Sequence, residues 1–421
     1  MRRGSDAAPK LKHLPFFELL AKDEAREPDA RHATAGLLML RLLDHWEIAG
    51  SPMVAPESVS VRSLRAAIMA LPAGDAVREC LLGIVNAVQT LQVADSAPVL
   101  PRLQAYASLL ERRAEHALAA DVYASIAERA SETTDGDLLI DARLRIGFCE
   151  RTLGHFSEAE DAYQTAGTIA RRRGDVERVL RSRTGLANVA SQRGNLPLAE
   201  SLFEQIVREG AERELPGLQA GAMHALATIT YKRGFPARAV RMADEALQLT
   251  TDPVERERLL VTIGALLTAL GRFTAARDAL MVTELTARTE EARSSARVML
   301  LTIAARVGDR AEFEEGLARV EGRALNAETE ANFLIESARG WHRFGESERA
   351  SDVLERGRRF AESHGLSRSI FEIDAMAEEL EREASVARGE EGADATVSGT
   401  LPGVELRMRR LAAALTETPG A

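Results

Sequence analysis

Residues 144–166 read LRIGFCERTLGHFSEAEDAYQTA, and this stretch decides the fold. Apolar residues recur three and four positions apart on both sides of Gly154, as on the buried faces of two amphipathic helices. Gly154 falls between the two patterns, where a glycine can end a helix in the left-handed conformation without steric cost. Small residues, Gly147 and Ala159, flank the turn and let two backbones approach closely. The stretch therefore predicts a tightly packed pair of antiparallel helices.

The same arrangement recurs along the chain. The turn residue returns at 40-residue steps from Ala114 to Gly234, and at 37-residue steps from Gly234 to Gly345. A small residue precedes most turns by seven positions, and an alanine follows most turns by five. Self-similarity at a fixed period predicts a repeat architecture in which each helix pair packs against the next. The residues that define the repeat are Gly147, Gly154, Ala159, Tyr163, Ala187, Gly194, Ala199, Phe203, Gly234, Ala239, Gly264, Gly271, Ala276, Gly345 and Ala350.

This spacing resembles the tetratricopeptide repeat, in which a large and a small residue precede the turn and the pattern A-x3-F follows it. The copies from Ile146 to Tyr163 and from Leu186 to Phe203 match closely. The resemblance covers residues 98–365 and implies an all-α fold, a right-handed α-solenoid of about seven antiparallel helix pairs. Because the family period is usually ~34 residues, helices or loops longer than standard are expected here.

The remaining segments are assigned by composition and helical periodicity. The N-terminal region contains three amphipathic helices, near 30–48, 59–71 and 75–92, that form a divergent repeat or a cap, since a solenoid end must be covered. The resulting order is a flexible leader at 1–28, the N-terminal helical region at 29–97, the repeat array at 98–365, a C-terminal capping helix at 366–388 and a flexible tail at 389–421.

The tail contains a short amphipathic segment, Val404–Leu415, which returns to helical spacing beside three arginines. An isolated helix of about twelve residues is marginal in water. The segment is therefore expected to be disordered alone and helical only when docked. Docking in the molecule's own groove, recognition of another protein and a frayed tail without a role are all left open.

Composition excludes several classes of function. The net charge of −10 argues against broad nucleic-acid binding. No apolar run is long enough to span a membrane, and the two cysteines favour a reducing cytoplasm. Nearly all positive charge is arginine, which fits a bacterial, GC-rich genome. No nucleotide loop, metal-ligand spacing or catalytic constellation is present, so no cofactor or metal is expected. Cys149 is interpreted as a buried, inert thiol.

In tetratricopeptide proteins the first helix of each pair lines a concave groove. The resemblance places groove residues on the first helix, mostly two, three, six or nine positions before the turn. These residues are polar and often cationic here, which suits an acidic or carboxylate-bearing peptide; ordinary solvation of an exposed helix face explains them as well. The groove residues are Asn188, Gln192, His224, Thr228, Tyr231, Lys232, Arg258, Arg306, Arg339, His342 and Arg343.

Three classes of function follow from these observations. The leading hypothesis is a non-catalytic scaffold or adaptor that binds a protein or peptide in its groove. The second is a regulatory sensor that responds to a peptide or another ligand. The third is an enzyme with a site in residues 1–97, although no motif supports one and a fold alone does not give function. Self-association is left open.

Overall fold

The computed structural model describes residues 11–21, 27–49, 59–90, 98–323, 325–386 and 402–416. Within these ranges every regular element is an α-helix and no β-strand occurs, so the all-α prediction is confirmed. The chain divides into two compact units, 1–202 and 203–421. The boundary falls inside α10 (Leu196–Glu212).

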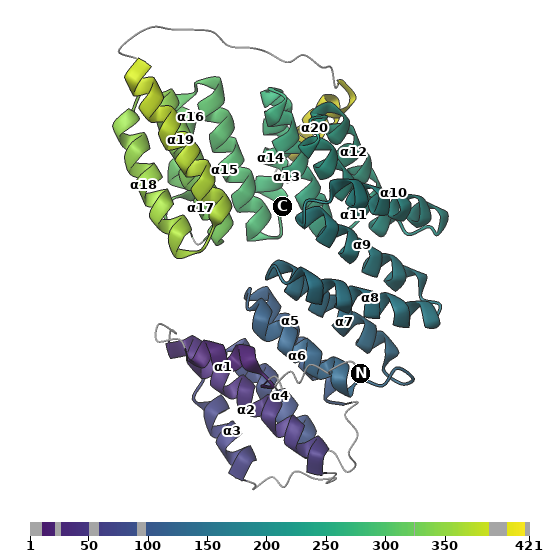
Figure 1. Ribbon diagram of the computed structural model, residues 1–421. Coiled ribbons are helices and arrows are strands. Elements are labelled where there is room, and N and C mark those ends of the chain that lie inside the picture. The colour runs from purple at the N-terminus through teal and green to yellow at the C-terminus, as the bar shows by residue number, and fades with distance from the viewer. Residues whose placement is uncertain are drawn as a thin grey trace, which may run out of the picture. The chain divides into compact units, whose positions relative to one another are not determined.

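Helix pairs fill the region predicted to hold the array (Figure 1). The turn residues between paired helices include Gly154, Gly194 and Gly234, whose φ angles of 82°, 81° and 86° are reached without strain only by glycine. Ala114 holds the same position at a φ of 60°. The pairs are α5 (Leu100–Arg112) with α6 (His116–Arg129), α7 (Gly136–Thr152) with α8 (Phe156–Arg172), α9 (Val176–Gln192) with α10 (Leu196–Glu212), α11 (Pro216–Lys232) with α12 (Pro236–Leu249), α13 (Pro253–Ala269) with α14 (Phe273–Thr286), α15 (Glu290–Val307) with α16 (Arg310–Val320), and α17 (Ala327–Arg343) with α18 (Ser347–Ser363).

Helix length accounts for part of the difference between the two repeat periods. Two helices of 17 residues, α8 and α9, fill the 40-residue step from Gly154 to Gly194. The 37-residue step from Gly234 to Gly271 contains α12, which has 14 residues, and α13, which has 17. The helix α6 also has 14 residues, but residues 130–135 form a longer connection to α7 and keep that step at 40 residues. Long helices and a long connection therefore both occur where the period predicts longer helices or loops.

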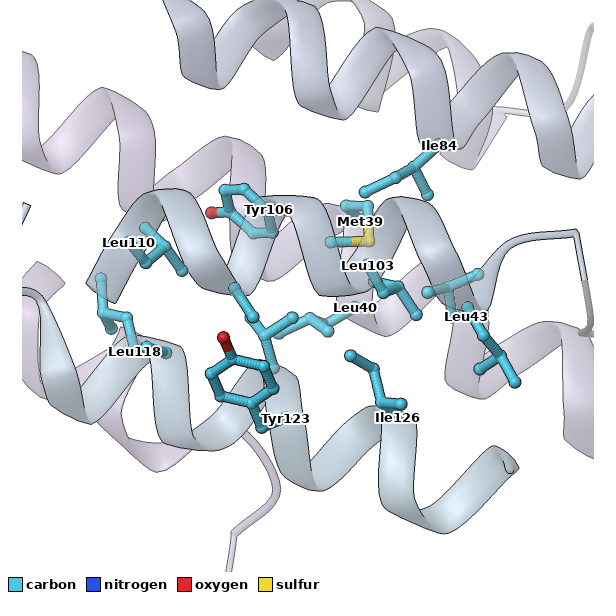
Figure 2. Close-up of a cluster of buried hydrophobic side chains, with 14 of the residues drawn as sticks. Met39, Leu40, Leu43, Ile84, Leu103, Tyr106, Leu110, Leu118, Tyr123 and Ile126 are labelled. Atoms are coloured by element: carbon cyan, nitrogen blue, oxygen red, sulfur yellow. The ribbon is translucent and has the colours of Figure 1, made fainter. Parts of the chain in front are cut away.

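The N-terminal helices α2 (Glu27–Ala49), α3 (Val59–Met69) and α4 (Ala76–Thr90) share one hydrophobic core with the first repeat. Figure 2 shows Met39 and Leu40 of α2 and Ile84 of α4 gathered with Leu103 and Tyr106 of α5. The described part of the N-terminal region is thus packed against the array as a cap would be.

The leader prediction is wrong for residues 14–20, which form α1 (Leu14–Leu20) with Phe16 fully buried. Pro15 stands in the first turn of this helix, where its missing N–H costs nothing. The proline therefore starts a helix rather than interrupting an apolar run. Residues 1–10 and 22–26 of the predicted leader lie outside the described residues.

Two helices follow the array in the second unit. α19 (Ser367–Val386) packs against α18 and α17, where the sequence predicts a capping helix. α20 (Pro402–Thr416) packs against α14 and, over a smaller area, α12 (Figure 1). The predicted flexible tail thus contains a docked helix, and the docking place is on second helices of the pairs rather than in the groove. Residues 389–401 and 417–421 lie outside the described residues.

Candidate functional site

A cavity of about 650 Å³ lies in the first unit, on the three consecutive first helices α5, α7 and α9. First helices are the elements that the family resemblance places along the groove. Two tyrosines, Tyr123 of α6 and Tyr163 of α8, reach the same cavity from the second helices. They stand 40 residues apart, so they are copies of one repeat position.

Tyr163 reaches the cavity because two glycines leave room for its ring. A Cβ atom added to Gly147 of α7 would lie 2.8 Å from the ring, and one added to Gly185 of α9 would lie 2.3 Å from it. In the preceding repeat the Tyr123 hydroxyl lies 3.1 Å from the Ser108 Oγ and donates to the Glu111 Oε2 at 3.3 Å. Two phenol groups therefore take part in the cavity wall.

Two arginines lie against a phenylalanine near the C-terminal end of α7. The Arg145 guanidinium carbon lies 4.7 Å from the centroid of the Phe148 ring, and that of Arg151 lies 5.4 Å from it. Arg145 also donates from Nε to the Glu111 Oε2 at 2.8 Å. Burial lowers the pKa of Arg145, and Arg151 hydrogen-bonds the Tyr163 side chain. Cation–π contacts of this kind hold guanidinium groups flat against an aromatic face.

Another arginine, Arg178, connects two neighbouring repeats. Arg178 of α9 donates from Nε and a terminal nitrogen to both carboxylate oxygens of Asp141 on α7, at 2.8 and 2.9 Å. It also donates to the Asp175 Oδ2 at 2.7 Å. The hydrogen bonds to Asp141, above all, raise the pKa of Arg178. Such a bidentate pair fixes geometry as well as charge.

The cavity wall has more arginines than acids. Five arginines and four carboxylates line it. Arg145 and Arg178 are paired as described, and Arg181 pairs with Glu177 at 2.7 Å. Among the described residues, no carboxylate forms an ion pair with Arg112 or Arg151. These two guanidinium groups are therefore free of competition from an internal carboxylate.

The structure distributes the predicted groove residues over both units, and only Asn188 lines the cavity. Several of the predicted cations are engaged with acids: Arg258 pairs with Glu255 at 3.1 Å, and Arg339 pairs with Glu336. Tyr231 is 43% exposed, and Thr228, Lys232, Gln192, Arg306 and Arg343 are also exposed. The binding of a ligand by these residues stays a prediction.

Sequence reasoning overlooked most of the cavity residues, yet the same positional rule identifies them. Counting two, three, six and nine positions back from Gly154 gives Arg151, Phe148 and Arg145 among others, and counting from Ala114 gives Arg112, Glu111 and Ser108. The groove residues predicted from the sequence begin in the repeat of Gly194, so those of the first two repeats are not among them. In the first two repeats these positions hold Arg112, Arg145 and Arg151 together with Phe148, and not polar residues alone.

A polar cluster joins first helices α11 and α13 in the second unit. His224 lies 2.8 Å from both the Glu255 Oε1 and the Thr262 Oγ1. Although burial opposes ionisation, hydrogen bonds from His224 and Arg258 hold the pKa of Glu255 below its usual range. His224 therefore links adjacent repeats, a role that the groove interpretation did not include.

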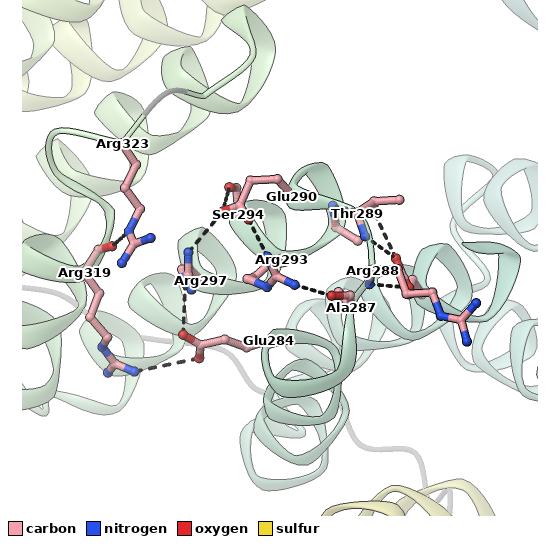
Figure 3. A network of polar contacts seen from close by, with 12 residues as sticks. Glu284, Ala287, Arg288, Thr289, Glu290, Arg293, Ser294, Arg297, Arg319 and Arg323 are labelled. Carbon is pink, nitrogen blue, oxygen red and sulfur yellow. Dashed lines mark hydrogen bonds and ion pairs between the residues drawn. The ribbon is translucent and has the colours of Figure 1, made fainter. Parts of the chain in front are cut away.

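Another network, shown in Figure 3, is structural. Arg297 of α15 donates from Nε to the Glu284 Oε1 of α14 at 3.0 Å, and Arg319 of α16 lies 3.8 Å from the same carboxylate. Nearby, the buried Glu257 accepts hydrogen bonds from the Arg288 and Thr289 backbone nitrogens at 2.6 and 3.2 Å. These contacts fix the connection between α14 and α15.

Other site chemistries receive no support from the described residues. Cys149 is fully buried, and burial raises its pKa to about 11, as expected of an inert thiol. No group of three or more potential metal ligands occurs within the ranges that the structure describes. Over the same ranges, no helix has the length and apolarity that crossing a membrane requires.

Comparisons with known proteins agree with the repeat. A family model described as tetratricopeptide repeat matches residues 219–251, which lie in α11 and α12. No curated protein matches the chain. Three solved structures give likenesses at low identity and with TM-scores below one half, so the assignment rests on the chain's own repeats. They are a Rap protein complexed with competence and sporulation factor (12% identity, TM-score 0.49, 80% of this chain and 99% of that chain), the apo form of RapI (13%, 0.48, 63% and 99%), and the apo form of the quorum sensor NprR from B. thuringiensis (14%, 0.47, 76% and 97%).

The matched repeat occupies one of seven successive helix pairs, six of which have glycine at the turn and most of which share the small-residue spacing. The chain therefore contains a tetratricopeptide repeat at residues 219–251, within a longer series of helix pairs.

Proposed function

We propose that this protein is a non-catalytic binding protein that holds a peptide segment in the cavity on α5, α7 and α9. The observation that carries the proposal is the pair of cavity arginines, Arg112 and Arg151, that form no ion pair among the described residues. They lie in the same open cavity as the Phe148 ring and as Arg178, which forms a bidentate pair with Asp141. A binding protein needs this combination of apolar contact and a few directed polar groups.

The charge of the cavity favours a ligand that carries a carboxylate. Arg112 is exposed in the cavity lining and Arg151 lies over the Phe148 ring, and neither guanidinium group is paired with a carboxylate among the described residues. A planar guanidinium matches a carboxylate with two parallel hydrogen bonds. The half-buried Phe148 ring supplies apolar surface for a side chain next to that carboxylate. An acidic side chain or the free carboxyl end of a peptide meets these requirements.

Affinity selection with random octapeptides tests the proposal. The probes are a pool with free carboxyl ends and the same pool with amidated ends, each passed over the immobilised full chain. We expect the full chain to enrich peptides that carry a carboxylate, and Arg151→Gln to weaken binding of an enriched peptide by about tenfold or more, the effect of losing a charged hydrogen bond.

Arg359→Gln is the matched control, because Arg359 is 69% exposed on α18, outside the cavity. It should leave binding unchanged. Absence of enrichment on the full chain, or equal binding by the wild type and an Arg112→Gln, Arg151→Gln double variant that retains its helical circular dichroism, contradicts the proposal. The acidic character of the partner, self-association, a cytoplasmic location and a sensor role all stay predictions.

A further inference from the structure

The helix α20 is seated in the hydrophobic core of the second unit. Met408 is fully buried and Val404 is 5% exposed. Both belong to one buried cluster with Ala279 and Val282 of α14, and the half-buried Leu411 packs against that cluster. A helix that lay loosely on the surface would not bury two apolar side chains so completely.

The sequence of α14 is adapted to this contact. Its residues four and eleven positions after the turn glycine are Ala275 and Val282, which are 6% and 7% exposed. The corresponding residues of α8 are Glu158 and Thr165, which are both exposed. The outer face of a second helix is polar in that repeat and apolar in α14. The apolar face therefore belongs to the contact with α20 and is not a general feature of the repeat.

Charged groups fix the direction of α20 on this surface. Arg407 forms an ion pair with Asp244 of α12 at 2.8 Å, and Glu405 lies 3.6 Å from Arg272 at the start of α14. Asp244 is only 6% exposed, and the Gln248 amide donates to its other oxygen at 3.1 Å. A buried carboxylate needs a partner of opposite charge. A helix placed in the reverse direction would not offer Glu405 to Arg272 and Arg407 to Asp244 together.

We propose that the α12–α14 surface, formed by Asp244, Arg272, Ala275, Ala279 and Val282, is a binding site for an amphipathic helix, and that α20 is its tethered ligand. Residues 387–401 connect α20 to α19, so α20 is always near this surface. A tether converts docking into an intramolecular event and keeps competitors out by its high effective concentration. The same helix supplied as a separate peptide therefore binds only when the tethered copy is undocked.

Fluorescence anisotropy with a labelled peptide of residues 402–416 tests this proposal on the full chain. Met408→Asp places a charge in the apolar contact and undocks the tethered helix. The peptide should bind this variant at least about tenfold more tightly than it binds the wild type. A peptide that itself carries Met408→Asp should not bind either chain. Equal affinity for the wild type and the variant, or no binding to the variant, overturns the proposal.

A charge exchange identifies the place where the peptide binds. Adding Asp244→Arg to the Met408→Asp chain should abolish peptide binding, and a peptide with Arg407→Asp should restore it on that chain. Asp161→Arg, at an exposed position of α8, is the control and should leave binding unchanged. Asp244→Asn gives a milder second variant in case the reversal prevents folding. Failure of the exchanged peptide to bind a folded Asp244→Arg chain contradicts the assigned site. None of these outcomes depends on the cavity in the first unit.

Discussion

At the scale of single residues, glycines within helices act through the space they leave for a side chain of the neighbouring helix. Gly147 and Gly185 both make room for the Tyr163 ring, and Gly340 makes room for Phe313, whose ring would lie 2.1 Å from an added Cβ atom. Gly221 sits in α11 with nothing within 4 Å of an added Cβ. The same substitution should therefore have opposite effects at these positions.

Replacing Gly185 by alanine should destabilise the protein by about 1–3 kcal/mol, because the new methyl group overlaps the Tyr163 ring and forces the helices apart. Gly221→Ala should stabilise the protein by about 0.5–1 kcal/mol, since alanine loses less backbone entropy in a helix. Urea unfolding followed by circular dichroism gives both values. Two changes of the same sign would show that the packing around Tyr163 is not as described.

At the scale of elements, α1 is held by a histidine between two carboxylates. The His13 Nδ1 lies 2.8 Å from the Asp121 Oδ2 of α6, and the Nε2 lies 3.2 Å from the Asp44 Oδ2 of α2. Asp44 also pairs with Arg129 at 2.7 Å and with Lys12 at 3.5 Å. Although burial disfavours the charged imidazole, hydrogen bonds to Asp121 and the charges of both carboxylates raise the pKa of His13.

This arrangement predicts that the first unit loses stability as the pH rises. The folded pKa of His13 lies above its ordinary value of 6.5, so its stabilising contribution is complete below about pH 6.5 and is lost as the pH passes through the folded pKa. Urea midpoints measured between about pH 6 and pH 8 should therefore fall in the wild type and vary less in His13→Gln. His45→Gln, at an exposed position on α2, should retain the wild-type slope. An unchanged slope in His13→Gln would contradict the assignment.

Sequence could predict the repeated elements and the helical spacing of Val404–Leu415. It could not predict the helix at residues 14–20 or the place where the tail helix docks, and the reason is physical. A turn glycine such as Gly154 fixes the ends of the two helices beside it, and each further copy at the same spacing strengthens the prediction of a helix pair. Pro15 and Met408 have no second copy, and their roles depend on helices far away in sequence. The first-turn position of Pro15 and the apolar face of α14 are visible in sequence only when the partner helix is known. The cavity was partly predictable, since the spacing that selected Asn188 also selects Arg151.

At the scale of the whole molecule, stability should be nearly a sum of local terms. Helices of a repeat array contact only their neighbours, so distant substitutions share no partner. Gly185→Ala in the first unit and Gly340→Ala in the second should therefore be additive within about 0.5 kcal/mol. Gly147→Ala and Gly185→Ala both displace Tyr163, so their combination should deviate from additivity by about 0.5 kcal/mol or more. Double-mutant cycles of urea unfolding measure both couplings, and strong coupling of the distant pair would refute local packing.

The docking of α20 also determines an order of events during synthesis. Contacts between successive repeats join residues that leave the ribosome close together in time, so they form early and quickly. The contact of Met408 with α14 closes a much longer loop, which costs more chain entropy and delays its formation. Ala275 and Val282 are therefore made long before the residues that cover them. Until residues 402–416 emerge, the nascent chain displays this apolar face, and a chaperone that protects it would have to leave before α20 arrives.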